Sequence, residues 1–497
     1  MLRVSFDDAY REWRNRARRY DPKSIVHEAL RLLCEPPSED HVTELRKAPW
    51  LTMLMVKWAC QDRYLDRKPA SAITRPQLND LRQRLWNIPE RLDHRNRGAM
   101  PLRLFMRQLL RPQLGFQRGI TRGFVREAVL LAEQGEAYPL RRLFREKTGF
   151  DVLDFIDLSL ATFTVVLDGK RQFRDDYFDP LLSSYSKETI SSYQSALART
   201  YPELIAFCRA LPNAEQKVAS EYFEFPALTR YPFFRAGNSM VCWHPTVFYR
   251  GLEGFVHSVL SEAGQDYMER FSRLFERYVV TEARRVPTRF IGEDELRRYI
   301  ADDTQVADGL LSFPGCNVFV ESKAGLFNES VMTVGNNELF AHKTRAVTTA
   351  VAQAWATSVS LREQRRAPLD VLNAEKDYLL IVTNKELGTS RGTSFASIYP
   401  SGTLDYPNAE AERLLPLGRV YVLTIEDFER LTSAAAGGQI DVPAFLASCV
   451  EDDDAPQKML MLFEQHLHRR GVLMQFSDPI ERAIDASNAR LEKALTN

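Results

Sequence analysis

The sequence predicts an α+β protein, in which a mostly α-helical N-terminal domain is followed by an α/β domain with a mixed central sheet flanked by helices. Three observations support this prediction. The chain has 497 residues, which is too long for one ordinary hydrophobic core. Apolar residues recur at helical spacing through residues 1–235. Beyond about residue 251, short β-type runs alternate with helical segments.

The predicted domain boundaries follow these changes of pattern. Residues 1–235 are expected to form the helical domain, because segments such as 24–34 and 152–166 carry apolar residues at i, i+3, i+4 and i+7. Residues 236–440 are expected to form the α/β domain. Residues 441–497 are expected to form a C-terminal helical tail.

Composition indicates a globular protein, with 44% hydrophobic and 27% charged residues. No stretch approaches ~18 uninterrupted apolar residues, so we expect no membrane partner. The first twenty residues contain no apolar core, so a secretory signal is not expected. The six cysteines show neither a CxxC spacing nor a zinc spacing with histidine. We therefore expect reduced thiols and a cytoplasmic location.

The charge is unevenly distributed along a chain whose net charge is zero. Residues 1–150 contain 30 Lys and Arg against 18 Asp and Glu, a balance of +12, and the remainder contains 36 against 48. This asymmetry suggests that the first part meets a polyanion and that the second part binds cations.

The C-terminal part contains four β-type runs. A long helix over about 251–285 is expected before the first run, and another over about 338–360 between the second and the third. This order predicts a mixed sheet flanked by helices. The runs are 307–313, 317–322, 377–383 and 419–424.

The first two runs flank the turn pair Pro314-Gly315. A hairpin centred on that pair places Asp308 directly opposite Glu321. Opposite Cβ atoms lie about 4.5–5.5 Å apart, so two carboxylates there would repel each other. A divalent cation between them removes the conflict, and Mg²⁺ (or Mn²⁺) suits a pair of carboxylates completed by water and phosphate oxygens.

Lys323 follows Glu321 by two residues, so strand alternation places both side chains on one face. Val318 and Val320 are expected to point the other way, into a core. An ammonium beside a cation can hold the attacking water or stabilise charge on a phosphate. These parts predict a metal-dependent nuclease that hydrolyses phosphodiester bonds.

The segment resembles the PD-(D/E)XK nuclease superfamily, whose pattern appears here as Asp308 followed by Glu321-Ser322-Lys323. The resemblance covers about 170 residues, from 255 to 430. It implies a restriction-endonuclease-like fold, with Asp308 and Glu321 as metal ligands and Lys323 as a catalytic residue. Ala307 stands where the family name implies proline, a residue that is commonly absent in the family.

The same resemblance implies further site residues. Glu276, in the preceding helix, matches the position of a family glutamate, and Glu269 and Glu282 compete with it. The helix after the Glu-x-Lys strand offers Gln353 as a catalytic residue and Lys343 as a nucleic-acid contact. Two other acids remain alternatives for the first carboxylate, although they fall outside the hairpin register: Asp302 and Asp303.

Residues 91–126 contain nine arginines and a single acid, Asp93. Six of the arginines recur at i, i+4 and i+8 in two sets, which on helices would form stripes able to bind a nucleic-acid backbone. The alternatives are a solvated face and an internal docking surface for the acidic half of the chain. The two sets, here called the arginine stripes, are Arg103, Arg107 and Arg111, and Arg118, Arg122 and Arg126.

Nuclease domains fused to unfamiliar helical domains resemble stand-alone bacterial effectors of anti-phage defence. That resemblance implies a nucleic acid, DNA or RNA, as the partner, and a protein trigger or regulator acting through the N-terminal domain. Many nucleases of this fold act as homodimers, but no interface is evident in the sequence. The alternative function is a catalytically inactive nuclease-fold module that binds nucleic acid or protein.

Overall fold

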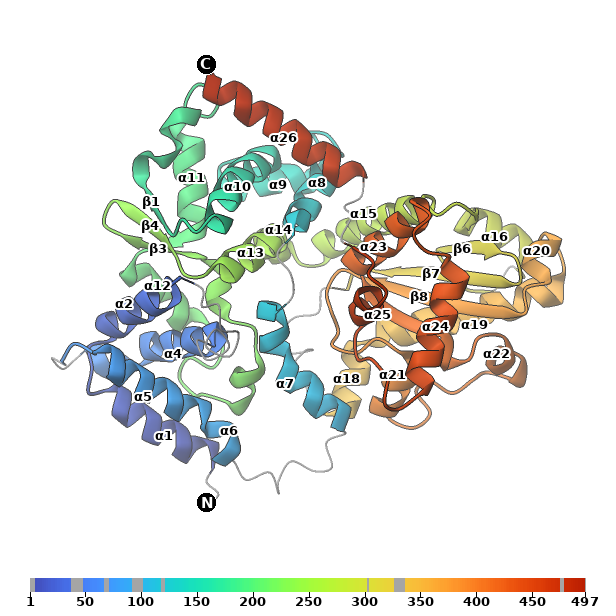
Figure 1. Ribbon diagram of the computed structural model, residues 1–497, viewed down its shortest axis with the longest axis horizontal. Helices are drawn as coiled ribbons and strands as arrows, with labels where there is room; N and C mark the ends of the chain where they lie inside the picture. Colours follow the sequence, from blue (N-terminus) through green and yellow to red (C-terminus); the bar gives the residue numbers. More distant parts are fainter. Residues whose placement is uncertain are drawn as a thin grey trace. The chain divides into compact units, whose positions relative to one another are not determined.

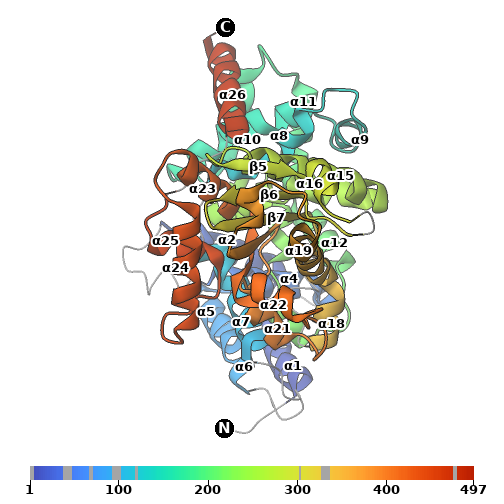
Figure 2. The same ribbon diagram turned by 90° about the vertical axis from the view of Figure 1, so that its right-hand side faces the viewer.

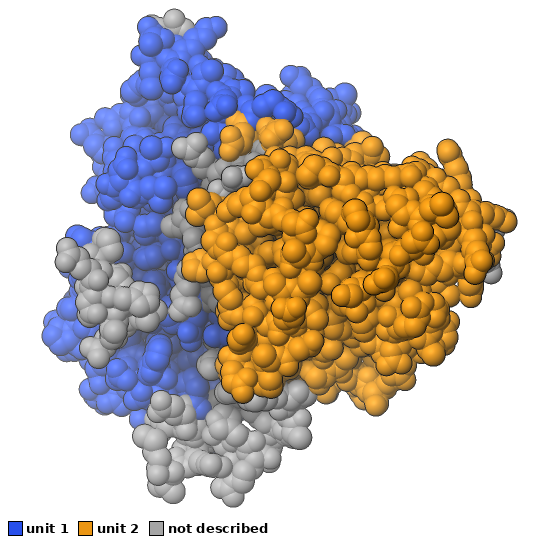
Figure 3. Space-filling view, turned by 45° about the vertical axis from the view of Figure 1, so that its right-hand side comes forward, with its two compact units in different colours: residues 1–99, 109–262, 482–497 blue, residues 100–108, 263–481 orange. Residues whose placement is uncertain are grey.

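The structure is a computed structural model, and it divides the chain into two compact units, coloured separately in Figure 3. Unit 1 comprises residues 1–99, 109–262 and 482–497, and unit 2 comprises residues 100–108 and 263–481. The residues that the structure describes are 5–36, 48–66, 71–91, 102–117, 121–301, 304–325, 336–473 and 478–496.

Unit 1 is built mainly of helices (Figure 1), as the sequence predicts. Helices α7 and α26 begin in unit 2 and continue in unit 1. The helices are α1 (Phe6–Ala17), α2 (Pro22–Leu33), α4 (Pro49–Gln61), α5 (Arg75–Trp86), α6 (Ile88–Arg91), α7 (Leu102–Gln117), α8 (Arg126–Ala132), α9 (Pro139–Thr148), α10 (Val152–Leu167), α11 (Lys187–Leu197), α12 (Tyr201–Ala210), α13 (Pro245–Glu253), α14 (Phe255–Leu260) and α26 (Asp478–Thr496).

Local sequence fixes several helix starts in this unit. The Ser5 side chain accepts a hydrogen bond from the Asp8 amide at 3.1 Å, and so caps α1. Asp151 and Asp154 form a capping box at the start of α10. These bonds satisfy amide groups that the first helical turn leaves without partners.

The core of unit 1 contains a buried ion pair beside its largest side chain. Trp58 is fully buried, and its indole N–H donates to Glu221 Oε2 at 2.9 Å. Lys57 Nζ lies 2.8 Å from the same oxygen. The carboxylate of Glu221 is therefore compensated by two donors, as a buried charge requires.

Unit 1 also contains a four-stranded sheet in the order β1-β4-β3-β2. The sequence pattern does not predict this sheet. Strands of two to four residues are too short to show an alternating pattern in the sequence. Gly237 joins β3 to β4 at φ 61°, a backbone conformation that favours glycine. The strands are β1 (Gln172–Arg174), β2 (Ala198–Arg199), β3 (Phe233–Ala236) and β4 (Ser239–Cys242).

Unit 2 contains a five-stranded mixed sheet in the order β5-β6-β7-β8-β9. Strands β5, β6 and β7 pair antiparallel, whereas β7, β8 and β9 pair parallel. The four predicted runs are confirmed as β6 to β9, and β5 was not foreseen. The strands are β5 (Arg289–Gly292), β6 (Gly309–Phe313), β7 (Cys316–Lys323), β8 (Lys376–Thr383) and β9 (Val420–Thr424).

Helices cover both faces of this sheet (Figures 1 and 2), with α19 on one face and α23 and α25 on the other. Val318, Phe319 and Val320 are all buried, although they alternate between the faces. The protein is therefore an α+β protein with a sheet flanked by helices. The helices are α15 (Gln265–Ala283), α16 (Glu293–Tyr299), α18 (Asn337–Lys343), α19 (Arg345–Gln364), α20 (Leu369–Leu372), α21 (Gly392–Ile398), α22 (Ala409–Leu414), α23 (Ile425–Ala436), α24 (Val442–Asp454) and α25 (Phe463–Arg469).

Two predicted long helices are interrupted. The helix expected over 251–285 breaks at Gly254 and at Gly264, which has a φ of 62°, so α15 begins only at Gln265. The helix expected over 338–360 is divided at Thr344, whose backbone leaves the helical region at φ −105° and ψ 21°. The Thr344 hydroxyl is buried against the Tyr399 hydroxyl at 2.7 Å.

The observed units differ from the predicted domains. A boundary at residue 235 would cut the hydrogen-bonded hairpin of β3 and β4, which belongs to unit 1 together with α13 and α14. Helices α24 and α25 belong to unit 2, where α25 packs on β9, so residues 441–497 do not form a separate tail.

Among the described residues, no helix combines the length and apolarity that crossing a membrane requires. All six cysteines are free thiols, as expected.

Unit 2 is held together by a buried charged network around Asp377, at the start of β8. Both terminal nitrogens of the Arg362 guanidinium, Nη1 and Nη2, donate to the Asp377 carboxylate, at 2.9 and 2.8 Å. Ser358 Oγ and Asn317 Nδ2 donate to it at 2.5 and 3.2 Å. This network ties α19 to β7 and β8, so it fixes the helix that carries Gln353.

We expect Arg362→Met to destabilise unit 2 by about 3–5 kcal/mol, because it leaves a buried carboxylate without its cation. Arg413→Ala is the control, since Arg413 forms an exposed ion pair with Glu410 and should have little effect. Urea unfolding of both variants measures the difference. Equal losses would contradict the role given to Asp377.

Candidate active site at the β6–β7 hairpin

The predicted hairpin register is confirmed. Gly309 pairs with Val320 and Phe313 with Cys316, around the turn at Pro314-Gly315. Asp308 lies one residue before β6, and this register places it opposite Glu321, near the end of β7. The two carboxylates therefore come from neighbouring strands at the same edge of the sheet.

The Asp308 side chain is held in place by the strand opposite. Its Oδ2 accepts hydrogen bonds from the amide and the hydroxyl of Ser322, at 2.7 and 2.6 Å. Among the described residues, Oδ1 accepts no hydrogen bond. Asp308 is thus oriented through one oxygen and retains acceptor capacity on the other.

Glu321 is fully buried, and it is only half satisfied. Its Oε2 lies 2.6 Å from Lys323 Nζ, as strand alternation predicts. Its Oε1 is buried without a hydrogen-bond partner in the part of the chain that the structure describes. Helix α19 covers this face of β7.

This environment changes the acidity of Glu321. Burial and, after it, the nearby charge of Asp308 raise the pKa of Glu321 to about 8, although Lys323 opposes the rise. The ionised form of Glu321 is energetically unfavourable in this position unless a second cation lies beside it. The site therefore favours either a proton or a cation beside Glu321.

Gln353, predicted as a catalytic residue, is brought into the site by α19. Lys323 Nζ donates to Gln353 Oε1 at 3.3 Å, while Gln353 Nε2 contacts the Val306 carbonyl at 3.4 Å. Lys323 is consequently held between a carboxylate and an amide oxygen. Its side chain remains 18% exposed, so it has access to solvent.

Glu276 lies on α15, which packs on β7. Burial, followed by the charges of Asp308 and Glu293, raises the pKa of Glu276, whereas Lys323 lowers it. The charges of the site therefore act on Glu276, although no hydrogen bond among the described residues joins it to Glu321 or Lys323. Of its two predicted competitors, Glu269 is exposed and Glu282 is bonded to Arg285 at 2.8 Å.

One acid near the site was missed in the sequence. Glu293 is the first residue of α16, directly after β5, and its charge raises the pKa of both Glu276 and Glu321. The signal was weak, because β5 has only four residues and was not recognised as a strand. The alternatives Asp302 and Asp303 lie outside the described residues.

The residues of the site suit a hard divalent cation. No group of three or more His, Cys, Asp or Glu side chains among the described residues is arranged to hold a metal ion. Mg²⁺, however, typically takes one or two carboxylates and completes its coordination with water. Asp308 and Glu321 meet that requirement, because the unpartnered Oε1 of Glu321 is a buried acceptor that lacks a donor.

The remaining predicted contacts do not form one surface. Lys343 ends the separate helix α18, so it does not share a continuous helix with Gln353. Arg103 bonds the hydroxyl of Ser394 and, at 3.4 Å, the sulfur of Met459. Arg107 is buried: it donates to the Leu387 carbonyl, and its guanidinium lies over the ring of Phe340.

The arginines of the two stripes whose side chains the structure describes are therefore half-buried or buried. Arg126 is buried in unit 1, and Arg111 is half-buried in the part of α7 that belongs to that unit. Arg118 lies outside the described residues, and so does the side chain of Arg122. The prediction of a backbone-binding stripe is wrong for Arg107 and Arg126, because their helices turn these residues inward.

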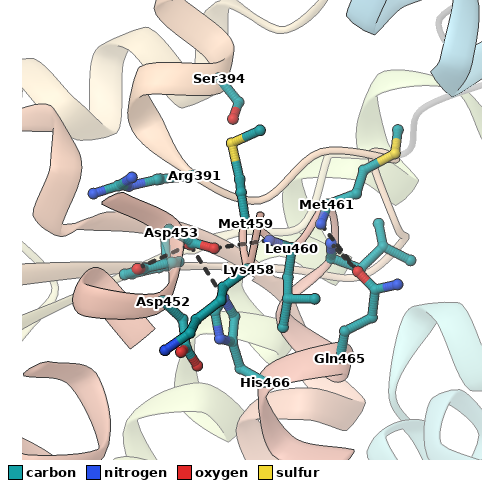
Figure 4. A network of polar contacts seen from close by, with 12 residues as sticks. Arg391, Ser394, Asp452, Asp453, Lys458, Met459, Leu460, Met461, Gln465 and His466 are labelled. Atoms are coloured by element: carbon teal, nitrogen blue, oxygen red, sulfur yellow. Dashed lines mark hydrogen bonds and ion pairs between the residues drawn. The ribbon is translucent and has the colours of Figure 1, made fainter. Parts of the chain in front are cut away.

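A second polar network in unit 2 shows how a structural carboxylate differs from Glu321 (Figure 4). Asp453 accepts hydrogen bonds from the Leu460 amide at 2.9 Å, and from the Tyr421 hydroxyl at 3.2 Å. His466 Nε2 lies 3.1 Å from the same carboxylate. Burial alone would raise the pKa of Asp453, but His466 and the Leu460 amide hold it below its ordinary value. Asp453 thus uses one oxygen to fasten the loop after α24 and the other to bond β9 and α25.

Comparison of the chain with protein-family models, with curated proteins and with solved structures finds no match. The geometry of the site's own side chains is therefore the basis for its proposed chemistry. Asp308, Glu321, Lys323 and Gln353 are brought together as the sequence predicts.

The buried Glu321 predicts a pH-dependent stability in the absence of divalent cations. A folded-state pKa of about 8, against 4.5 ordinarily, means that its contribution to stability is fully present below pH 4.5 and is lost as the pH rises through 8. In EDTA, we expect the free energy of unfolding of the wild type to fall as the pH rises from about 5 to about 9. For Glu321→Gln, we expect this fall to be smaller by roughly 2–4 kcal/mol. Urea unfolding at each pH measures this difference.

The exposed Glu375, which directly precedes β8, supplies the control, and Glu375→Gln should follow the wild-type curve. Parallel curves for the wild type and Glu321→Gln would show that Glu321 is not strained by burial.

Proposed function

We propose that unit 2 is a metal-dependent nuclease that hydrolyses phosphodiester bonds in nucleic acid, with Asp308, Glu321 and Lys323 at its centre. One observation carries the proposal: a fully buried Glu321 keeps one carboxylate oxygen without a partner, opposite a second carboxylate and beside an ammonium. A purely structural ion pair gains nothing from an unsatisfied buried oxygen. A cation bound during the reaction would give that oxygen a partner.

The order of elements supports the proposal. Helix α15 precedes three antiparallel strands, and α19 follows β7 and leads to the parallel strand β8. That order and the Asp308 … Glu321-Ser322-Lys323 pattern resemble the PD-(D/E)XK nuclease superfamily. Gln353, on the helix after the Glu-x-Lys strand, agrees with the same pattern.

In the proposed mechanism, Asp308 and Glu321 would hold Mg²⁺ or Mn²⁺. When bound, such a cation lowers the pKa of water and offsets the negative charge of the phosphate. Ser322 orients Asp308 through its amide and hydroxyl, which both donate to one carboxylate oxygen and leave the other able to accept.

Lys323 is the principal hydrogen-bond donor of the proposed site. Its ammonium can hold the attacking water in line, or donate to a phosphate oxygen as negative charge develops there. Gln353 is a positioning residue, because it binds Lys323 and not the reacting atoms. Glu276, whose pKa is raised, is proposed to bind the site through water.

The biological role that we propose is anti-phage defence, in which unit 1 responds to a trigger. The division into a nuclease-like unit and a helical unit supports this extension. Expression of the wild type should lower phage plating efficiency in a bacterial host, and Glu321→Ala should abolish that effect. Equal plating with both would remove defence from the proposal and leave nuclease activity to the direct assay.

The direct assay is cleavage of plasmid DNA, linear DNA and total RNA with Mg²⁺ or Mn²⁺. We expect the wild type to cut at least one substrate. Glu321→Ala and Lys323→Ala should reduce cleavage at least ~100-fold, because each removes charge stabilisation from the transition state. Gln353→Ala should lower the rate less and shift its pH profile, since it positions Lys323.

The matched controls are Glu375→Ala and Lys376→Ala, which remove the same charges from the exposed region beside β8 and should leave cleavage unchanged. Cleavage by a folded Glu321→Ala variant would refute the proposed site. An inert wild type that also fails to bind Mg²⁺ in calorimetry would favour the alternative, an inactive nuclease-fold module.

A further inference from the structure

Unit 1 contains a cavity of about 360 Å³ between α9, α11 and α14. Its walls carry three cationic side chains, from Lys147, Arg199 and Arg230, and no acidic side chain. Hydroxyl groups supply the rest of its polar lining, from Thr148, Ser191, Ser192 and Ser195. The cavity therefore offers hydrogen-bond donors and positive charge from several separate elements.

The two arginines are fixed in position by the backbone and by aromatic rings. Arg199 Nη1 donates to the carbonyls of Ser195 and Ala198, at 2.5 and 2.7 Å. Its guanidinium lies 3.7 Å from the centre of the Tyr231 ring. Arg230 lies 5.0 Å from the rings of both Tyr231 and Phe255. Guanidinium groups held in this way lose little further freedom when a ligand binds.

Neither arginine forms an ion pair with a carboxylate in the part of the chain that the structure describes. Among the described residues, no carboxylate lies within 4 Å of the guanidinium of Arg199 or Arg230, whereas Lys147 pairs at 2.5 Å with the exposed Glu262. Burial lowers the pKa of Arg230 and the neighbouring Arg199 lowers it too, whereas Tyr231 and Glu262 raise it. Two adjacent, partly buried cations that lack a paired carboxylate are costly, and a bound anion reduces that cost.

We infer that this cavity binds a small phosphorylated organic molecule of about mononucleotide size. Guanidinium forks and hydroxyl donors match the geometry of phosphate oxygens. A cavity of this volume lies within the range of small-molecule sites, about 300–1,000 Å³. Every residue of the site belongs to unit 1, so the inference does not rest on nuclease activity in unit 2.

Calorimetry of the full chain in EDTA tests the inference with four probes: inorganic phosphate, pyrophosphate, AMP and ATP. EDTA removes divalent cations, so binding at Asp308 and Glu321 does not contribute. We expect AMP or ATP to bind more tightly than inorganic phosphate, with an affinity that falls as salt is raised. Arg199→Ala should weaken this binding at least about tenfold, which is a loss of ~1.4 kcal/mol.

Arg142→Ala is the matched control, because Arg142 is an exposed arginine of α9 that does not line the cavity, and it should bind as the wild type does. Arg199→Lys and Lys147→Ala keep the test decisive if Arg199→Ala does not fold. Arg199→Lys should bind more weakly than the wild type, because it retains the charge but loses the fork. The inference is overturned if neither AMP nor ATP binds the wild type, if inorganic phosphate binds as tightly as they do, or if the cavity variants bind like Arg142→Ala.

Discussion

Burial of the five-stranded sheet on both faces is the constraint on which the chemistry of unit 2 depends. A charge carried by a strand of such a sheet must be compensated by groups that reach it inside the protein. Asp377 is compensated by a guanidinium, a hydroxyl and an amide. Glu321, on the neighbouring strand, receives a hydrogen bond from Lys323 alone among the described residues. Burial raises the pKa of both carboxylates, but of the two Glu321 keeps an oxygen that lacks a partner.

This difference between satisfied and unsatisfied charges recurs in unit 1. Arg141 is buried, and it is matched by Asp151, which it contacts at 2.8 Å. Among the described residues, Arg199 and Arg230 contact backbone carbonyls and aromatic rings and form no ion pair, beside a cavity. A protein retains an uncompensated buried charge at a cost in stability, so such positions are where function is expected. By this criterion the cationic cavity in unit 1 and the carboxylate pair in unit 2 are candidate sites.

Helical spacing alone was a poor guide to exposed arginines. Arg103 and Arg107 do lie one turn apart on α7, as their i, i+4 spacing requires. Both are nevertheless used inside unit 2, since Arg103 binds Ser394 and Arg107 lies over the ring of Phe340. Arginine has a long apolar stem and five donors, so it can be buried wherever carbonyls and aromatic rings are available. Charge periodicity therefore identified a helix face but not the surroundings of that face.

The sequence by itself determined the elements whose signals are local. The turn at Pro314-Gly315 and the β-type runs beside it set the register of β6 and β7, and this register placed Asp308 opposite Glu321. Alternation along β7 placed Lys323 beside Glu321. Only the tertiary structure decided that Glu321 is buried, because that depends on helices distant in the chain. The same holds for the cavity in unit 1, whose cations come from separate elements that no sequence spacing relates.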